Sequence, residues 1–355
     1  MERMQFRHLA YALFILIISG CTTSKHISTN PINTFSNGGP DFKNKVVFTT
    51  LPVGAGNCQI VSCPKSSKVI INDCGSTGKG DLGLDPVTAA YTIEAIRNEI
   101  NAKELALTVS HSDLDHNNYL EKVTETLQFF YGETPYTLTF LGGDVTKYNK
   151  ATLDTLKKAS QQVYFSKPDT PESFTNYEPG LSCEDDDYKT WILLNNFGSN
   201  ANSKSLVTVS LINNGKTSVY FTGDMEGTTS AEIIERYNKN KFNNLDLSKV
   251  TESVLTIPHH GATTNNSSNI YWAAFTNPNI LVVSAGSKHG HPGCDAVNMY
   301  TNLSATVGSG IHKFTCYKDG YKQTIDTDIY KYLTEENGSI YIELTGQPAS
   351  ISWDK

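Results

Sequence analysis

The sequence predicts an α/β fold in which two sheets pack together and helices cover their outer faces. Short apolar runs bounded by turn residues, such as those at 46–53 and 67–73, are typical of buried strands. Segments with apolar residues at helical spacing follow these strands along the chain. The second half repeats the alternation, so two strand-and-helix halves are expected to form a sandwich.

The individual elements follow from local signals. Asp85-Pro86 begins a predicted helix that runs to Asn101 and carries apolar residues at helical spacing. The run from Leu105 to Ser110 is a predicted strand. Strands at 205–213 and 217–223 form a predicted hairpin around Asn214-Gly215. Further helices are expected near 117–127, 149–160 and 227–239.

The first 43 residues carry signals of export. Arg3 and Arg7 precede a short apolar run, and the sequence Ile-Ser-Gly-Cys ends at Cys21, as in a secretory signal. The last four residues resemble a bacterial lipobox, which implies cleavage before Cys21 and lipid attachment to it. Residues 22–43 then form a tether, and 44–355 one large domain. A plain anchor helix is the alternative, and both place the domain in the bacterial cell envelope, facing the periplasm or the exterior.

Cysteine content and charge limit the classes of function that the chain is expected to have. Without Cys21, six cysteines remain, and at least one disulfide is expected, although fifteen complete pairings exist. They are Cys58, Cys63, Cys74, Cys183, Cys294 and Cys316. The formal charge of −7 falls to about −8 without residues 1–21, so unspecific binding to long nucleic acid is disfavoured. The segment 166–188 has no period and is either a lid near the site or a surface insertion.

The hexad His111-Ser112-Asp113-Leu114-Asp115-His116 directly follows a predicted strand and predicts a dinuclear metal site. Imidazole nitrogens and carboxylate oxygens suit zinc, and carboxylate-rich sets also admit manganese. Because alternate residues face the same way, His111 and Asp113 are expected to hold one ion while Asp115 and His116 hold a second. The alternative is an exposed acidic loop whose two histidines are hydrogen-bonded within the protein and bind no metal.

The hexad resembles the His-x-His-x-Asp-His signature of metallo-β-lactamase-fold hydrolases, with Asp113 at the second histidine position. This variant resembles the hydrolase domain of ComEC-type competence proteins. Other segments match in the same order, and the likeness covers about residues 46–345; they are 51–61, 69–76, 219–226, 254–262 and 280–292. The resemblance implies the four-layer αββα sandwich.

The resemblance also implies the remaining ligands. Asp224 would bridge two divalent ions, most simply zinc, with manganese as the alternative. One ion would be held by His111, Asp113, Asp224 and one of His259 and His260, with His260 favoured. The other would be held by Asp115, His116, Asp224 and one of His289 and His291, with His291 favoured. His259 would contact substrate or protonate a leaving group, with Asp115 as the second catalytic candidate. Asp73 would orient a ligand from behind, or serve as a structural turn, and His289 would be a neighbour.

Some positions depart from the pattern of the resembled family. The usual Gly-Gln-Gly-Asp appears here as Gly54-Ala55-Gly56-Asn57, so Asn57 stands in place of the aspartate. Ala262 replaces a serine, and Asn117-Asn118 stands where small apolar or glycine residues are usual. The implied metal ligands are retained, whereas substrate-facing positions differ. Substrate specificity is therefore not transferred from the competence proteins.

The sequence thus predicts an exported, lipid-anchored hydrolase that uses two ions and a hydroxide nucleophile on a phosphoester or phosphodiester bond. Nucleic acid or an envelope polymer would be the substrate, the membrane would be contacted through the lipid, and no protein partner is inferable. Hydrolysis of β-lactams or other amides and esters is the alternative within the same fold. A third reading is a surface-displayed binding module without catalysis.

Overall fold

The computed structural model describes residues 39–78, 83–165, 177–301, 312–327, 330–344 and 350–354. The predicted signal segment at 1–21, including Cys21, and most of the predicted tether lie outside these residues. Of the helices that are described, none combines the length and apolar character needed to cross a membrane.

The larger sheet of the described chain has eight strands in the order β16-β15-β1-β2-β3-β4-β5-β6. Its strands are β1 (Val47–Thr50), β2 (Gly56–Cys63), β3 (Lys68–Ser76), β4 (Glu104–Val109), β5 (Tyr136–Leu141), β6 (Ser160–Phe165), β15 (Ser339–Glu343) and β16 (Ser350–Asp354). The strands β3 to β6 run parallel to one another. β15 comes from the far end of the chain and pairs antiparallel with β1.

The second sheet has six strands in the described residues, in the order β14-β11-β10-β9-β8-β7. Its strands are β7 (Lys189–Leu194), β8 (Val207–Ile212), β9 (Thr217–Phe221), β10 (Glu252–Thr256), β11 (Ile280–Val283) and β14 (Tyr330–Leu333). The strands β9, β10, β11 and β14 are parallel neighbours. A separate hairpin joins β12 (His312–Lys318) to β13 (Tyr321–Thr327).

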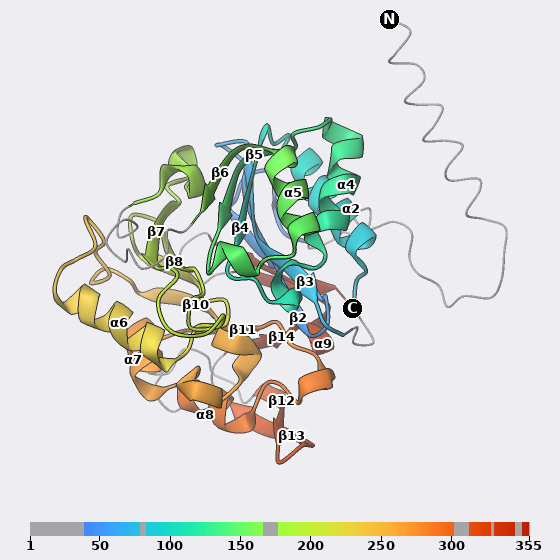
Figure 1. Ribbon diagram of the computed structural model, residues 1–355. Helices are drawn as coiled ribbons and strands as arrows, with labels where there is room; N and C mark the ends of the chain where they lie inside the picture. The colour runs from blue at the N-terminus through green and yellow to red at the C-terminus, as the bar shows by residue number, and fades with distance from the viewer. Residues whose placement is uncertain are drawn as a thin grey trace, which may run out of the picture. The chain divides into compact units, whose positions relative to one another are not determined.

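Three apolar cores show that the sheets and helices form four layers (Figure 1). One core lies between the larger sheet and α2 (Pro86–Glu99), α4 (Leu120–Tyr131) and α5 (Lys150–Ala159). A second lies between the smaller sheet and α6 (Gly227–Asn238), α7 (Ile270–Thr276) and α8 (Cys294–Thr301). The third lies between the sheets, where the rings of Phe48 and Phe221 have centroids 5.5 Å apart. The predicted αββα sandwich is confirmed.

The predicted elements of the first half form close to their expected ends. Asp85 caps α2, because its carboxylate accepts hydrogen bonds from the backbone N–H groups of Val87 and Thr88. The helix expected near 117–127 begins slightly later, as α4, and is preceded by the short helix α3 (Leu114–Asn117), which includes the last three residues of the hexad. The short helix α9 (Thr334–Asn337) follows β14. The predicted hairpin between β8 and β9 turns through Asn213 and Asn214, both with φ of +58°.

Three disulfides use all six cysteines of the domain: Cys58–Cys74, Cys63–Cys183 and Cys294–Cys316. The expectation of at least one bridge is confirmed. Cys58–Cys74 joins neighbouring strands, whereas Cys294–Cys316 joins α8 to β12. Cys63–Cys183 closes the longest loop, with a sequence separation of 120.

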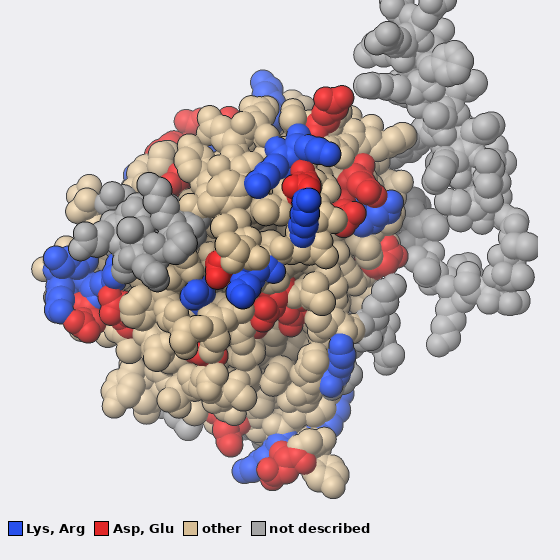
Figure 2. Space-filling model, in the orientation of Figure 1, with Lys and Arg blue, Asp and Glu red and all other residues tan. Residues whose placement is uncertain are grey.

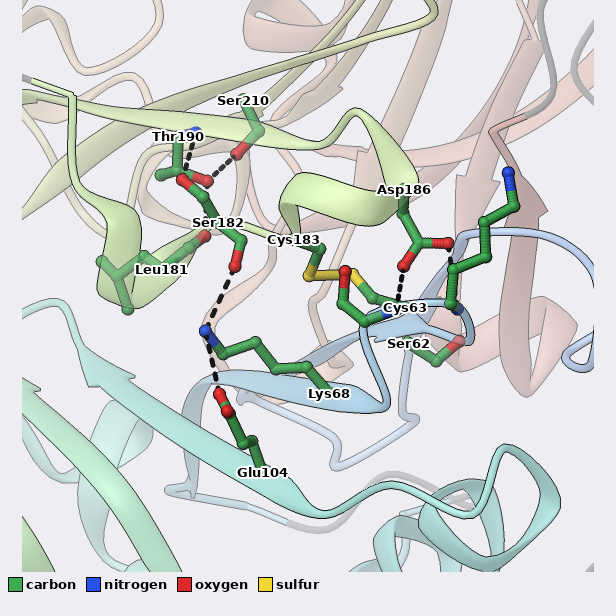
Figure 3. Close-up of a disulfide and its surroundings, with 12 residues drawn as sticks. Ser62, Cys63, Lys68, Glu104, Leu181, Ser182, Cys183, Asp186, Thr190 and Ser210 are labelled. Carbon is green, nitrogen blue, oxygen red and sulfur yellow. Dashed lines mark hydrogen bonds and ion pairs between the residues drawn. A yellow bond between two sulfur atoms is a disulfide. The ribbon is translucent and has the colours of Figure 1, made fainter.

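Figure 3 shows how the segment around Cys183 is fastened to the turn between β2 and β3. The carboxylate of Asp186 accepts hydrogen bonds from the backbone N–H groups of Lys65 and Ser66, at 3.2 and 2.8 Å. Lys68 donates to the carbonyl of Ser182 at 3.1 Å. Cys63 is the last residue of β2, so this attachment lies at the opposite end of β2 from Asn57. The described part of segment 166–188 is thus held away from that end.

Replacing Cys63 and Cys183 together by alanine is expected to lower the free energy of unfolding by about 5 kcal/mol, because the unfolded chain gains the freedom of a long loop. The same change at Cys294 and Cys316 is expected to cost about 3 kcal/mol, since that loop is much shorter. Equilibrium denaturation in guanidinium measures both. Equal losses, or the larger loss in the second pair, would contradict the loop-length argument.

Candidate metal centre

The site residues follow the carboxyl ends of parallel strands in both sheets. The hexad begins two residues after β4, Asp224 follows β9, and His259 and His260 follow β10. Two glycines permit this close meeting. A Cβ at Gly75 would lie 2.5 Å from the carbonyl oxygen of Leu114, and one at Gly223 would lie 2.6 Å from the Cβ of Ser110. The hexad therefore packs directly on β3 and on the end of β9.

Asp224 lies at the centre of the histidines, and each of its oxygens faces a different pair. Oδ1 is 2.9 Å from Nε2 of His116 and 3.5 Å from Nε2 of His260. Oδ2 is 3.6 Å from Nε2 of His259 and 4.0 Å from Nε2 of His111. The carboxylate is buried, with 3% of the residue exposed. This is the arrangement that a bridging ligand requires.

Two further carboxylates lie beside these histidines. Asp113 Oδ2 is 3.6 Å from Nε2 of His111, and Asp115 Oδ2 is 3.6 Å from Nε2 of His260. The ligand atoms of Asp115, His116, Asp224 and His260 all lie within 4.8 Å of one another. The expected grouping placed His260 with His111 and Asp113. In the structure His260 lies with Asp115 and His116 instead, and His259 lies on the side of His111.

The hydrogen bonds made by Nδ1 indicate which ring nitrogen of His116 and of His260 carries the proton. His116 Nδ1 lies 2.7 Å from Asp73 Oδ2, and His260 Nδ1 lies 2.6 Å from the carbonyl of Ser284. Both partners are acceptors, so Nδ1 donates in each case. Nε2 of each ring then faces Asp224, and it carries the lone pair when the ring is neutral.

In the other two histidines, His111 and His259, Nδ1 is also the ring nitrogen that carries the proton. Ser110 donates its hydroxyl proton to Asp73, so its oxygen accepts from Nδ1 of His111 at 3.0 Å. Ser267 donates to the carbonyl of Thr264, so its oxygen accepts from Nδ1 of His259 at 3.1 Å. In their neutral forms the four histidines therefore direct Nε2 toward one carboxylate, and Nε2 of His259 also lies 3.2 Å from Nδ2 of Asn202.

This convergence fits divalent cations. Nε2 of His111, His116 and His260 and Oδ1 of Asp224 are buried without a hydrogen-bond partner. A nitrogen lone pair and a carboxylate oxygen at such short distances repel each other unless a positive charge lies between them. Nitrogen and oxygen donors in these proportions suit zinc or manganese.

The acid–base properties of the site also show an excess of negative charge. Burial lowers the pKa of His116, but Asp224 and Asp73 outweigh burial and raise it well above its usual value. Burial raises the pKa of Asp224, yet the attraction of His116 and His260 brings it well below its usual range. Burial also raises the pKa of Asp115, but His260 and His116 together outweigh burial and bring it to about 2. The carboxylates stay ionised at neutral pH, as metal ligands must.

Asp73 contacts His116 on the side of the ring away from Asp224, as the resemblance implied. Its Oδ1 accepts from the backbone N–H of Ser110 at 2.6 Å, and its Oδ2 accepts from His116 Nδ1. Asn57 donates to the same Oδ2 at 3.3 Å. The Cys58–Cys74 disulfide joins the residues next to Asn57 and Asp73. The carboxylate that orients His116 is thus fixed from both strands.

Asn57→Asp, which restores the family residue, is expected to lower the free energy of unfolding by about 1–3 kcal/mol at neutral pH. The new buried carboxyl would face Asp73, which raises its folded pKa above the unfolded value. Stability relative to the parent protein should therefore fall as pH rises through that interval. Denaturation at about pH 4.5 and about pH 7.5 measures this.

Asn72→Asp is the matched control, because Asn72 is also buried but its oxygen already accepts from Thr108. A smaller loss is expected there. An equal loss in the two variants, or a loss at Asn57 that does not depend on pH, would contradict the contact with Asp73 as its cause.

His291 and His289 lie at the edge of the cluster. The ring of His291 is 6.3 Å from that of His259 and 6.3 Å from that of His289. Burial, followed by repulsion from His260 and His259, lowers the pKa of His291 to about 4. His291 is thus neutral at pH 7, the state that a ligand needs. His289 is exposed and contacts Thr77 through Nε2 at 3.2 Å.

Several residues that hold the histidines in place were not predicted from the sequence. They are Ser110, Asn202, Ser205, Ser267 and Ser284. Only Ser110 lies next to the hexad. The others come from loops whose approach to the histidines depends on the tertiary fold, and no local pattern marks them.

The chain matches no protein-family model and no curated protein sequence. Among solved structures it is similar to yeast PDE1, with 11% identity, a TM-score of 0.40, and coverage of 73% of this chain and 96% of that one. It is similar to the metallo-β-lactamase-fold protein YhfI from Bacillus subtilis, with 11% identity, a TM-score of 0.39, and coverage of 73% and 94%. A diphosphatase of the PhnP family has 11% identity, a TM-score of 0.37, and coverage of 80% and 100%.

Proposed function

We propose that this chain is a hydrolase that uses two divalent metal ions and acts on phosphoester bonds. The observation that carries the proposal is the position of Asp224, whose two oxygens face two separate groups of histidine nitrogens and carboxylates. Two such ions supply Lewis acidity and lower the pKa of a water molecule toward neutrality.

The distances favour one assignment of the ligands. His111, Asp113 and His259 would hold one ion with Asp224 Oδ2, and Asp115, His116 and His260 would hold the other with Asp224 Oδ1. His259 is then a ligand rather than a proton donor, since its Nδ1 proton is directed to Ser267. His291, neutral and adjacent, remains a proposed further ligand. Zinc is the proposed metal, with manganese as the alternative.

The proposed metal ligands and the residues next to His291 favour a phosphoester substrate over an amide. Asp113 adds a carboxylate where typical β-lactamases have a histidine, in keeping with the resemblance to ComEC-type hydrolase domains. Close to His291, Lys288 donates a hydrogen bond to the carbonyl of Thr77, and His289 contacts the same residue. These groups suit an anionic substrate.

The substrate is proposed to be a small ester or an envelope polymer rather than long duplex nucleic acid. The chain carries a formal charge of −7. On the face shown in Figure 2, the described lysine and arginine side chains are interspersed with acidic ones and form no continuous track. Such a surface gains little from the release of counterions along a phosphate backbone.

Export and lipid attachment at Cys21 belong to the same proposal. Three disulfides within the domain support an oxidising compartment, because cytosolic thiols are kept reduced. Incorporation of labelled fatty acid into the wild-type protein and its loss in Cys21→Ser would agree with a lipid-anchored envelope protein. Labelling that persists in Cys21→Ser would contradict it.

Hydrolysis of bis(p-nitrophenyl) phosphate by the zinc- or manganese-loaded protein, run beside a chromogenic β-lactam, tests the activity. Turnover of the phosphodiester is expected, with loss on chelation and recovery when metal is restored. Asp246→Asn, a change at an exposed acidic residue, is the control and should behave as the parent. Turnover of the β-lactam alone would favour amide hydrolysis. A protein that binds both ions but cleaves neither compound would favour the binding module.

A further inference from the structure

His259 is held by residues from two separate loops, one at each ring nitrogen. Ser267 Oγ lies 3.1 Å from Nδ1, and Asn202 Nδ2 lies 3.2 Å from Nε2, where a bound ion would replace it at the single lone pair. The backbone of His259 has φ of +52°, which non-glycine residues seldom adopt. The direction of the Nε2 lone pair therefore depends on how the two loops are placed.

Glu226 connects these two loops. It lies just before the first residue of α6 and is buried, with 5% exposed, yet its side chain makes no capping hydrogen bond to that helix. Its carboxylate instead accepts from Nδ2 of Asn200 at 3.0 Å and from Nδ2 of Asn265 at 2.7 Å. A buried carboxylate with two amide donors from different loops acts as an acceptor for both.

Each amide lies next to one of the contacts of His259. Asn200 Oδ1 accepts from the backbone N–H of Ser203 at 2.8 Å, which closes the turn that contains Asn202. Asn265 lies in the short helix η6 (Thr264–Asn266), two residues before Ser267. Glu226 thereby fixes the turn that presents Asn202 and the segment that presents Ser267.

The start of α6 packs against both loops without spare room. A Cβ at Gly227 would lie 2.8 Å from the Cβ of Asn266, and the hydroxyl of Thr229 donates to the carbonyl of Ser203 at 2.5 Å. The spacing leaves the loops little freedom as long as the amides stay bonded to Glu226.

We infer that Glu226 is a positioning residue that orients His259 for metal binding by joining the Asn200 turn to the Asn265 segment. The inference rests on the proposed function, since it takes His259 to be a ligand of the ion held with His111 and Asp113. Glu226 itself contacts neither the ion nor the substrate.

Glu226→Gln tests this role, because the glutamine amide turns one acceptor into a donor that faces an asparagine donor. In the metal-free protein, nitrogen NMR of the His259 ring should change from one fixed tautomer, with the proton on Nδ1, to an exchanging mixture. The affinity for the ion of the His111 group should fall about 10–100-fold, while the ion of the His116 group is retained. Glu235→Gln is the control, since Glu235 is exposed on the same helix and pairs with Lys239.

The double variant Glu226→Gln with Asn265→Asp restores a donor and an acceptor in reversed order and should recover the fixed tautomer and the lost affinity. If Glu226→Gln fails to fold, Asn265→Ala removes one of the two links and should give the same ring signature. An unchanged ring and unchanged affinities for both ions would overturn the inference. A wild-type protein that binds no metal would instead overturn the proposed function, while the ring signal still decides the role of Glu226.

Discussion

Asp224→Asn is expected to abolish binding of both metal ions and to lower turnover of the phosphodiester by at least about a thousandfold. Each oxygen of Asp224 faces one of the two groups, and the substitution removes the charge and one of the two oxygens. Metal analysis by mass spectrometry and steady-state kinetics measure the two effects. The melting temperature of the metal-free protein reports separately on folding.

Asp113→Asn is the matched comparison, since Asp113 lies beside His111 in one group. It should lose one ion and keep the other. Retention of both ions in Asp224→Asn would contradict the bridging role of this residue. Equal metal loss in the two variants would contradict the division of the ligands into two groups.

The second large effect concerns the assignment of His260, tested with pairs of substitutions. His260→Ala combined with Asp115→Asn is expected to leave one ion per chain, because both changes fall in the same group. His260→Ala combined with Asp113→Asn is expected to leave none, because each group then loses a ligand. Metal content per chain after dialysis gives the answer.

The opposite result would be one ion retained when His260→Ala is combined with Asp113→Asn and none when it is combined with Asp115→Asn. That result would show that His260 binds the same ion as His111 and Asp113. The corresponding pairs with His259→Ala should mirror the result, since its Nε2 lies on the Oδ2 side of Asp224. If the pairs with His259→Ala and the pairs with His260→Ala give mirrored results, misfolding of one variant does not explain the metal loss.

The residues of this cluster can be located in the sequence, because they follow strand ends. The hexad after β4, Asp224 after β9 and the histidine pair after β10 are marked by apolar runs that stop at polar residues. Parallel strands bring such ends to one edge of a sheet. The alternation of strands and helices along each half predicted a sandwich of sheets with outer helices, and the family resemblance implied the αββα order of its layers.

The sequence was not sufficient to predict how the histidines and carboxylates group around Asp224. His259 and His260 are neighbours, and which one faces which oxygen of Asp224 depends on two consecutive left-handed backbone conformations, with φ of +52° and +53°. Their Nδ1 partners, Ser267 and Ser284, come from different segments. A pattern of residue types does not encode such directions.

Long-range partners were hidden from the sequence for a similar reason. The pairing of β15 with β1 joins strands almost 300 residues apart, and Cys63–Cys183 joins residues 120 apart. The role of Asn57 was also unforeseen, since only the structure shows its amide donating to Asp73. Contacts of this kind depend on tertiary packing.

The central claim is that Asp224 bridges two divalent ions, and the most direct measurement is the number of metal ions per chain in the purified protein by native mass spectrometry. The account predicts two ions in the wild-type protein and none in Asp224→Asn. A single ion in the wild-type protein, or a wild-type protein that stays free of metal after incubation with zinc and with manganese, would contradict it.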